Sequence, residues 1–425
     1  MKFDYLKDWK KRAFNKLEGR GKFLDFLFEE PKDKNDIVFD LHFHTQGSDG
    51  DRTPRMAGHE AQANGVQKMA FADHDTLRSI DDLVNGQADL ADYTGEFING
   101  VEVTSRLEGK AVEVLVYDFD YDKAKELASS GEFPFLDRKF RLSRIVELIK
   151  KRIDVVNELG VTDVPLKLEN FVSLEIENEN GNIVNVPFSE LGISADIAVR
   201  MSRFAKTEIR DFVQYKGKKH RVNYDYFNSK LFKLISNSEK GKKFLNEIEI
   251  GSKKSIENFA EFNRFLIQRK DSPLYVSDEK YWPTVDQVCD FAKKTGGVAI
   301  FAHPFGYGNL GISPQDLMKK AIAAGVDGIE CMHGFNEPDE IEEIYKVCYA
   351  NDLVFTAGSD THGFYSSQGN RTEVGRFPSQ GFKSRIEDNK LEDAKIGTYN
   401  IHHFGSGAWR KAKSFDVDEP SIMQK

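Results

Sequence analysis

The chain has 425 residues, 40% of them hydrophobic and 30% charged, which excludes wholesale disorder and predicts two or three domains, or one large core with an insertion. The formal net charge of −9 argues against a protein that coats nucleic acid with its whole surface, but it allows a local basic face. The sequence contains neither an apolar run of membrane-helix length nor a signal-peptide core, so we expect a cytoplasmic protein with no membrane partner.

Residues 1–35 have apolar positions at helical spacing and are expected to form an N-terminal extension. Strands and helices then alternate over residues 36–118, and the alternation resumes over residues 284–425, which end in a tail. The expected strands are 37–43, 67–72, 97–103, 111–117, 297–301, 326–330 and 352–357, and the expected helices are 53–65, 77–91, 284–295, 313–324 and 337–350. This alternation predicts parallel strands with crossover helices, and therefore an α/β sheet or barrel.

Residues 119–283 interrupt this pattern and are expected to form a mainly helical insertion domain. Helices are predicted over 136–159, 196–215 and 225–270, and a hairpin with Asn-Gly near its tip is predicted over 171–188. The stretch 205–255 has 13 Lys or Arg against 6 Asp or Glu. It is either an ordinary solvated helical face or a basic lid that attracts a phosphorylated substrate.

Histidines and carboxylates occur at the ends of the predicted strands. His42 and His44 alternate along the first strand and so face the same side. The later strand ends carry Asp73, His74, Asp75, Glu102, His303, Glu330, His333, Asp360 and His362. In a barrel these groups would meet at one pole, where divalent cations are the natural compensation for their charge. Because none of the three cysteines lies in a C-x-x-C pair, mixed His/Asp/Glu ligation of Mn²⁺, Fe²⁺ or Zn²⁺ is favoured.

The ordered motifs DLHFHTQGSDGDRTP, FADHDTLRSI, NGVEVT, AIFAHP and AGSDTHG resemble those of the PHP (polymerase and histidinol phosphatase) superfamily, over roughly 37–118 and 284–376. The resemblance implies a distorted (β/α)₇ barrel, interrupted by the insertion, with a trinuclear metal centre of two or three divalent ions, Mn²⁺ before Fe²⁺ or Zn²⁺. It implies one ion held by His42, His44, Glu102 and Asp360, a second reached by Glu102 and His303, and a third held by Asp49, His74 and His362.

The SDG sequence in the first motif and the helical insertion resemble the nucleotide and RNA phosphoesterase branch of that superfamily. Where that branch usually has a histidine ligand, this chain has Glu113, which is a candidate ligand of different charge for the second site. The stretch 195–201 also lacks a histidine that is often found in the branch. These two departures bear on the metal preference and on the exact substrate.

The expected activity is that of a metal-dependent phosphoric ester hydrolase. We expect a metal-activated hydroxide to cleave a phosphomonoester of a nucleotide or an oligonucleotide end. Asp75 and His333 are candidate proton donors to the leaving oxygen, although Asp75 could instead orient a histidine ligand. Arg138, Arg141 and Arg144 follow i, i+3, i+6 spacing and either bind substrate phosphate or form a solvated helix face.

Two alternatives to this activity stay open. The first is a phosphatase that acts on a small phosphorylated metabolite such as histidinol phosphate. The second is a catalytically degenerate, metal-binding regulatory module, for which Glu113 is the best support. The expected partner is therefore a phosphorylated small molecule or a short nucleic acid, and the sequence gives no indication of the oligomeric state.

Overall fold

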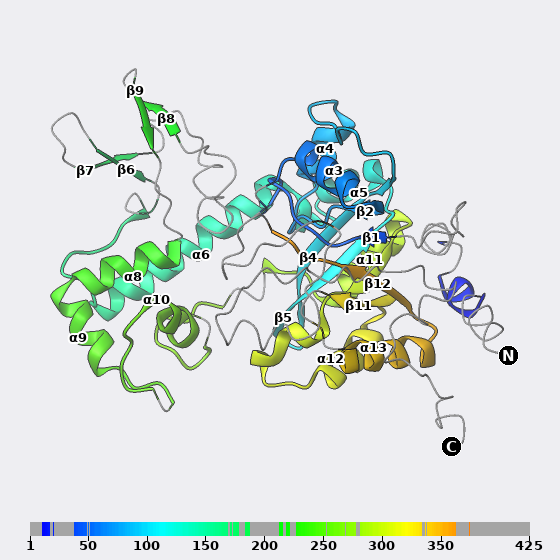
Figure 1. The fold of residues 1–425 in the computed structure, drawn as a ribbon. Helices are drawn as coiled ribbons and strands as arrows, with labels where there is room; N and C mark the ends of the chain where they lie inside the picture. The colour runs from blue at the N-terminus through cyan, green and yellow to red at the C-terminus, as the bar shows by residue number, and fades with distance from the viewer. Residues whose placement is uncertain are drawn as a thin grey trace, which may run out of the picture. The chain divides into compact units, whose positions relative to one another are not determined.

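The computed structural model describes residues 11–17, 20, 38–362 and 374, apart from internal gaps. The gaps are residues 49, 51, 169–170, 172, 178–182, 188–211, 216–217, 222–226, 252, 268, 278–280, 334–335 and 337. The chain divides into two compact units, Met1–Phe133 with Pro283–Lys425, and Pro134–Trp282 (Figure 1). The first unit therefore includes α5 (Tyr121–Ser130), which lies beyond the expected boundary at residue 118.

The first unit contains two sheets, with strand orders β1-β2-β3 and β12-β11-β10-β5-β4. Their bounds are β1 (Val38–Asp40), β2 (Val66–Ala70), β3 (Glu96–Ile98), β4 (Gly100–Leu107), β5 (Lys110–Tyr117), β10 (Val298–Phe301), β11 (Gly328–His333) and β12 (Val354–Gly358). Asn99 alone separates β3 from β4, and a parallel bridge joins Phe43 and Thr361 just after β1 and β12. The two sheets thus follow one another in a closed circuit, and the expected α/β class is confirmed.

One strand of this circuit runs against its neighbours, so the expectation of parallel strands is wrong at β5. This strand pairs antiparallel with both β4 and β10, whereas β10, β11 and β12 are parallel to one another. The reason is the two-residue turn between β4 and β5, where Glu108 and Gly109 have φ values of 51° and 74°. Two successive positive φ values are typical of a type I′ hairpin, which is too short to hold a crossover helix.

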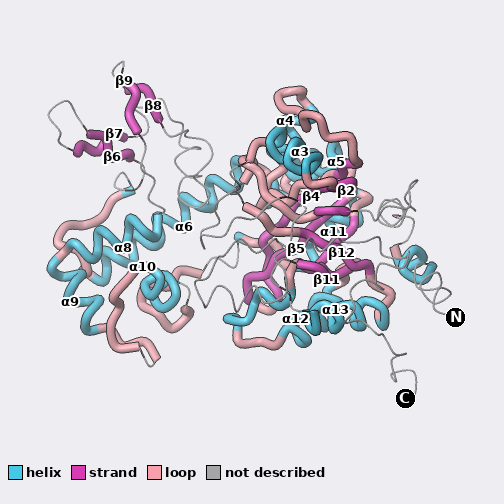
Figure 2. Tube along the Cα trace, viewed as in Figure 1, coloured by secondary structure: helices cyan, strands magenta, loops and turns pink. Residues whose placement is uncertain are grey.

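Helices flank the strands of the first unit (Figures 1 and 2). Besides α5 they are α3 (Pro54–Ala63), α4 (Arg78–Val84), α11 (Val285–Thr295), α12 (Pro314–Ala324) and α13 (Pro338–Ala350), with a short 3₁₀ segment η6 (Pro304–Leu310). Capping residues explain where two of them begin. The side chains of Thr53 and Ser313 accept the backbone N–H groups of Met56 and Asp316, and a proline follows each cap.

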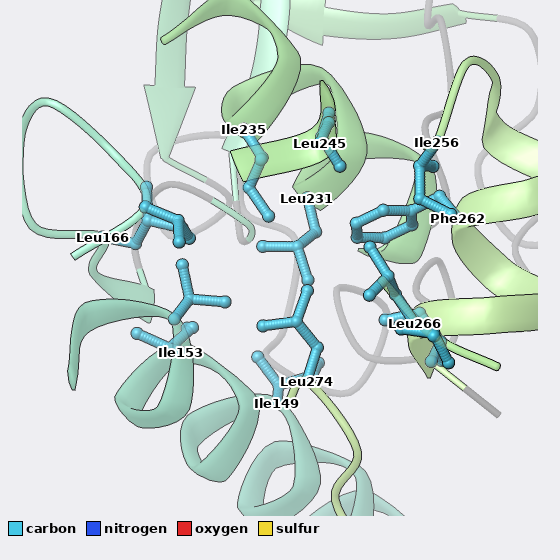
Figure 3. Close-up of a cluster of buried hydrophobic side chains, with 14 residues drawn as sticks. Ile149, Ile153, Leu166, Leu231, Ile235, Leu245, Ile256, Phe262, Leu266 and Leu274 are labelled. Atoms are coloured by element: carbon cyan, nitrogen blue, oxygen red, sulfur yellow. The ribbon is translucent and has the colours of Figure 1, made fainter. Parts of the chain in front are cut away.

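The second unit has its own hydrophobic core (Figure 3). Its helical elements are α6 (Arg138–Leu159), α8 (Phe227–Asn237), α9 (Glu239–Glu247), α10 (Phe259–Glu261), η1 (Pro134–Leu136) and η4 (Phe262–Ile267). Ile149 and Ile153 lie one turn apart on α6, and Leu231 and Ile235 lie one turn apart on α8. All four are buried in the same cluster, as their i, i+4 spacing predicts.

The described residues of the second unit also include two antiparallel strand pairs. The predicted hairpin is confirmed as β6 (Ser173–Glu177) paired antiparallel with β7 (Ile183–Pro187). The helix predicted over 196–215 is wrong at its end, because Phe212–Tyr215 is β8, paired antiparallel with β9 (Lys218–Arg221). The aromatic and β-branched residues Phe212, Val213 and Tyr215 favour a strand over a helix there. Residues 196–211 lie outside the described residues.

The described part of the N-terminal extension is attached to the first unit. Arg12 Nε donates to Asp352 Oδ1 at 2.8 Å. Arg20 binds both carboxylate oxygens of Asp327 at 2.7 and 2.8 Å and also donates to the carbonyl oxygen of Gly297. These contacts lie near the beginnings of β10, β11 and β12. Of the helices that the structure describes, none is both long enough and apolar enough to cross a membrane.

Candidate metal centre

The segment after β1 carries two histidines into the interior of the first unit. His42 and His44 are both fully buried, and their ring centroids are 5.4 Å apart. The backbone N–H of Asp360 donates to the carbonyl oxygen of His42 at 2.6 Å, and that of His44 donates to the carbonyl oxygen of Thr361 at 2.9 Å. These bonds bring together two motifs that are more than 300 positions apart in the chain.

Glu102 lies at the centre of four of the histidines. Its Oε2 is 3.3 Å from His42 Nε2, 3.4 Å from His44 Nε2 and 3.1 Å from His74 Nδ1. Its Oε1 is 3.2 Å from His303 Nε2. Because Glu102 is fully buried, its negative charge must be compensated inside the protein, by imidazolium groups or by a bound cation.

Asp360 is a second carboxylate that several histidines share. Its Oδ1 is 3.1 Å from His44 Nε2 and 3.5 Å from His42 Nε2, and its Oδ2 is 3.2 Å from His333 Nε2. His362 lies two residues further along the chain, and its Nδ1 is 3.6 Å from Asp360 Oδ1. The Asp360 carboxylate therefore links the ends of β1, β11 and β12.

The donor atoms converge in four overlapping groups, in each of which one atom per residue lies within 4.8 Å of the others. The groups are His44, His74 and His362; His42, Glu102 and His303; His42, His44 and Asp360; and His74, Glu102 and Glu113. The structure thus brings together all the predicted ligands except Asp49, which lies outside the described residues. The groups overlap with the three predicted ligand sets but divide the residues differently. His44 was predicted at the first ion, whereas it also lies with His74 and His362, which were predicted to hold the third.

Glu113 enters the cluster from the middle of the antiparallel strand β5. Its Oε1 is 3.7 Å from His74 Nδ1, and its Oε2 is 3.4 Å from His303 Nε2. Its backbone N–H donates to the Tyr307 hydroxyl oxygen at 2.8 Å. Burial and the nearby Glu102 carboxylate raise the pKa of Glu113 above its ordinary value. Two carboxylates this close together are a favourable environment for a cation.

The charges of these groups depend strongly on one another. Burial lowers the pKa of His42, but the carboxylates of Glu330, Glu102 and Asp360 outweigh burial and raise that pKa well above its ordinary value. The pKa of His303 is likewise raised to about 9, against burial, by its hydrogen bond to Glu102 and by the nearby carboxylates. Burial raises the pKa of Glu102 and of Asp360, but the histidines lower both well below the ordinary range. The histidines and the carboxylates of the cluster therefore stabilise one another's charged forms, and a bound cation would compete with the protons of the imidazoles.

The residues of the cluster fit divalent metal ions. His42 Nε2 and Glu102 Oε2 are buried 3.3 Å apart, yet neither makes a hydrogen bond with the described residues. Within the described ranges, neither Glu102 nor Asp360 forms an ion pair with a lysine or an arginine. Converging imidazole and carboxylate donors without thiolates suit Mn²⁺, Fe²⁺ or Zn²⁺.

Three more buried carboxylates support the ligands, and the sequence analysis did not assign them roles. Asp40 accepts the N–H and the hydroxyl of Ser359 at 2.9 and 2.6 Å, which fixes the residue before Asp360. Asp73 accepts the N–H and the hydroxyl of Thr45 at 2.8 and 2.7 Å. The third is Glu330. The available signal was position, because Asp40 and Asp73 lie at strand ends near predicted ligands and Glu330 is the last residue of the predicted strand 326–330.

The two predicted proton donors differ in their surroundings. Both carboxylate oxygens of Asp75 accept from Thr104, one from its N–H at 2.7 Å and one from its hydroxyl at 3.1 Å. His333 lies within the cluster, with its ring centroid 5.1 Å from that of His303 and its Nε2 3.2 Å from Asp360 Oδ2. The geometry therefore favours His333 as the group nearer to the ligands.

Arg138, Arg141 and Arg144 begin α6 in the second unit, as the sequence predicts. Their side chains lie outside the described part of the chain, so their role in binding phosphate stays a prediction. His59, which fits none of the motifs, is exposed on α3 and pairs with Asp92 at 2.9 Å.

No protein-family model matches the chain. The chain is 24% identical over 326 residues to a 5'-3' exoribonuclease of Haemophilus influenzae, an alignment that covers 76% of this chain and 89% of the relative. It is 27% identical over 135 residues to the 5'-3' exoribonuclease Rnm of Salmonella typhimurium, covering 32% of this chain and 44% of that relative. The expected resemblance to a nucleotide and RNA phosphoesterase branch agrees with the names of both relatives, which are 5'-3' exoribonucleases.

Three solved structures are also similar. One is described as a metal-dependent phosphoesterase from Bifidobacterium adolescentis, with 20% identity, a TM-score of 0.45 and coverage of 84% of this chain and 97% of that one. A Chromobacterium violaceum amidohydrolase has 18% identity, a TM-score of 0.46 and coverages of 84% and 98%. A two-domain Bacteroides vulgatus protein, described as containing a PHP-like phosphoesterase, has 12% identity, a TM-score of 0.32 and coverages of 81% and 60%.

Proposed function

We propose that this protein is a metal-dependent phosphoesterase, a hydrolase that cleaves a phosphate ester at the end of a nucleotide or an oligonucleotide. The observation that carries the proposal is the convergence of His42, His44, Glu102, His303 and Asp360 in one buried cluster. The relative from Haemophilus influenzae, which is named a 5'-3' exoribonuclease and is aligned over most of its length, supports a nucleic-acid end as the substrate.

Divalent ions in this cluster would polarise phosphate oxygens as Lewis acids and lower the pKa of a bound water enough for attack on phosphorus near neutral pH. Glu102 and Asp360 supply the negative charge that holds such ions, and the buried histidines fix the geometry. We assign proton donation to the leaving oxygen to His333. Asp75 is already engaged through both oxygens by Thr104 and would instead position the end of β2.

Two bonds at such an end are candidates for cleavage. Hydrolysis of the first phosphodiester at a 5′ end would release a mononucleotide, and the names of both sequence relatives favour this reaction. Hydrolysis of a terminal phosphomonoester would release inorganic phosphate, and the sequence motifs favour this reaction. We place the diester first and keep the monoester second. The phosphorylated substrate is the only partner that we propose, and a cytoplasmic location stays a prediction.

Product analysis separates these readings. The purified protein would be incubated with Mn²⁺ and short 5′-phosphorylated RNA, a 3′,5′-bisphosphonucleotide or histidinol phosphate, and the products identified by mass spectrometry. We expect mononucleotides from RNA, with loss of turnover in His42→Ala and Asp360→Ala but not in the control His59→Ala, which changes an exposed histidine.

Other products would change the proposal in specific ways. Phosphate release without shortening of the RNA would select the monoester reaction. Turnover of histidinol phosphate alone would indicate a small-metabolite phosphatase. Bound metal without turnover of any substrate would contradict the enzyme and leave a metal-binding regulatory module.

A further inference from the structure

Glu330 contacts two histidines of the ligand cluster, His42 and His303, but is not itself a predicted ligand. We propose that Glu330 is a positioning residue, which fixes the ring of His42 and the backbone of His303 so that both face one metal site. The inference rests on the proposed metal centre, but it concerns metal binding and is independent of which phosphate ester is cleaved.

Glu330 fixes the ring of His42 through a hydrogen bond. Glu330 is fully buried on β11, and its Oε1 is 2.8 Å from His42 Nδ1. An ionised carboxylate can only accept a hydrogen bond, so His42 Nδ1 must carry the proton. The lone pair of the neutral ring is then on Nε2, the atom that lies 3.3 Å from Glu102 Oε2. A carboxylate on the remote nitrogen both orients an imidazole ligand and makes it a stronger donor.

Glu330 also fixes the backbone of His303 through a second hydrogen bond. The other carboxylate oxygen of Glu330, Oε2, accepts the backbone N–H of His303 at 3.0 Å. His303 has a φ of 24°, a conformation that is unfavourable for a residue with a side chain. The hydrogen bond from Glu330 helps to hold this conformation, in which His303 Nε2 lies 3.2 Å from Glu102 Oε1. One carboxylate thus fixes both histidines of the group His42, Glu102 and His303.

Asp327 provides a matched control on the other end of the same strand. It is buried immediately before β11, and its Oδ2 accepts the backbone N–H of Ala299 on the same neighbouring strand, β10, at 2.9 Å. Its other partner is Arg20, so it fixes backbone without touching a histidine of the cluster. If Glu330 has a purely structural role, replacing either carboxylate should have the same effect on Mn²⁺ affinity. If Glu330 positions the histidines, only its replacement should lower that affinity.

The experiment compares Glu330→Gln with Asp327→Asn. A glutamine carbonyl can still accept from His42, but the amide group then faces the His303 N–H and cannot accept from it. Mn²⁺ affinity and stoichiometry would be measured by titration calorimetry and elemental analysis, and unfolding by denaturant. We expect Glu330→Gln to weaken binding of one ion by about 10–100-fold, the usual effect of losing such a partner. Asp327→Asn should lower stability and keep the wild-type Mn²⁺ affinity.

Two further measurements keep the test decisive. Glu330→Asp retains the charge, but its side chain is too short to reach both partners, so this variant should also weaken Mn²⁺ binding. It keeps the proposal testable if Glu330→Gln does not fold. In the Zn²⁺-loaded protein, the His42 Nδ1–H proton should give a slowly exchanging downfield NMR signal that Glu330→Gln alters and Asp327→Asn does not.

The proposal is overturned if both Glu330 variants bind Mn²⁺ as tightly as the wild type, or if Asp327→Asn weakens binding equally. A wild-type protein that binds Mn²⁺ without turnover would contradict the proposed function and leave this inference intact. A wild-type protein that binds no Mn²⁺ would contradict both.

Discussion

The two ends of β11 compensate buried negative charge in different ways. At the beginning of the strand, Asp327 lies against Arg20, whose guanidinium group binds both of its oxygens at 2.7 and 2.8 Å. Toward the other end, Glu330, Glu102 and Asp360 face histidines, and in the described part of the chain none of them pairs with a lysine or an arginine. One end contains its own permanent cation, while the other depends on protons or on metal ions.

This difference separates an end with a structural role from the end that we propose to be functional, and we call them the structural end and the functional end. Arginine is charged at every pH at which the protein folds, so Asp327 has a permanent cation beside it. Imidazoles can lose their charge as pH rises and are ligands when neutral, so we expect the opposite end to respond both to pH and to metal ions. Buried carboxylates alone therefore do not identify a metal site, and the nature of the group that compensates them does.

The largest expected effect comes from removing the central carboxylate of the functional end. Glu102→Gln should weaken Mn²⁺ binding by more than the roughly 100-fold upper value for residues that only support a ligand, because Glu102 touches four histidines. The rise in melting temperature on adding Mn²⁺ should disappear as well. Glu108→Gln is the control, because Glu108 is an exposed glutamate in the turn that follows β4, the strand of Glu102, and it pairs with Lys320. Equal Mn²⁺ affinity in Glu102→Gln and the wild type would contradict a metal centre at this end.

The structural end should respond in stability instead. Arg20→Ala leaves Asp327 buried without its cation, which typically costs about 3–5 kcal/mol of unfolding free energy. Denaturant unfolding of the metal-free protein would measure this loss, and Mn²⁺ titration should give the wild-type affinity. Adding Asp327→Asn to this variant should restore part of the stability, since it removes the uncompensated charge. A matching loss of Mn²⁺ affinity would show that the two ends are not independent.

The pH dependence should also distinguish the two ends. The folded-state pKa of His303 is raised to about 9, above its unfolded value near 6.5, so protonation contributes stability that is complete below about 6.5 and is lost as pH rises through about 9. Metal binding must displace such protons, so Mn²⁺ affinity should rise by about tenfold per pH unit for each displaced proton over this window. Calorimetry in buffers of different ionisation enthalpy would count the protons released. Release of no protons at pH 7 would contradict the raised imidazole pKa values.

The sequence predicted the parts of the site where the chemistry coincides with a strand end. His42, His44, His303 and Asp360 each follow an apolar run, so alternation and the closing of parallel strands were enough to place them together. Glu102 was placed at the end of a strand, but the strand breaks at Asn99 and continues as β4 to Leu107.

Other features depend on tertiary contacts that local patterns do not contain. Glu113 reaches the cluster from within a strand because β5 is reversed, and the signal for that reversal is the Glu108-Gly109 turn. Asp327 and Glu330 stand three positions apart on either side of the start of β11, and nothing local tells which of them meets a distant arginine. That distinction is set by Arg20, about 300 positions away in the chain.

The smallest expected effect tests whether this hairpin belongs to the functional end. Gly109 has a φ of 74°, so Gly109→Ala should cost about 1 kcal/mol of stability, and Gly109→Asn should cost less because asparagine tolerates this conformation. Mn²⁺ affinity should not change, because Glu102 and Glu113 are held by the pairing of β4 with β5 and of β5 with β10, away from the turn. A loss of Mn²⁺ affinity in proportion to the loss of stability would mean that the turn sets the register of both glutamates. The functional end would then extend along the hairpin, and its geometry would depend on a local turn as well as on the strand ends.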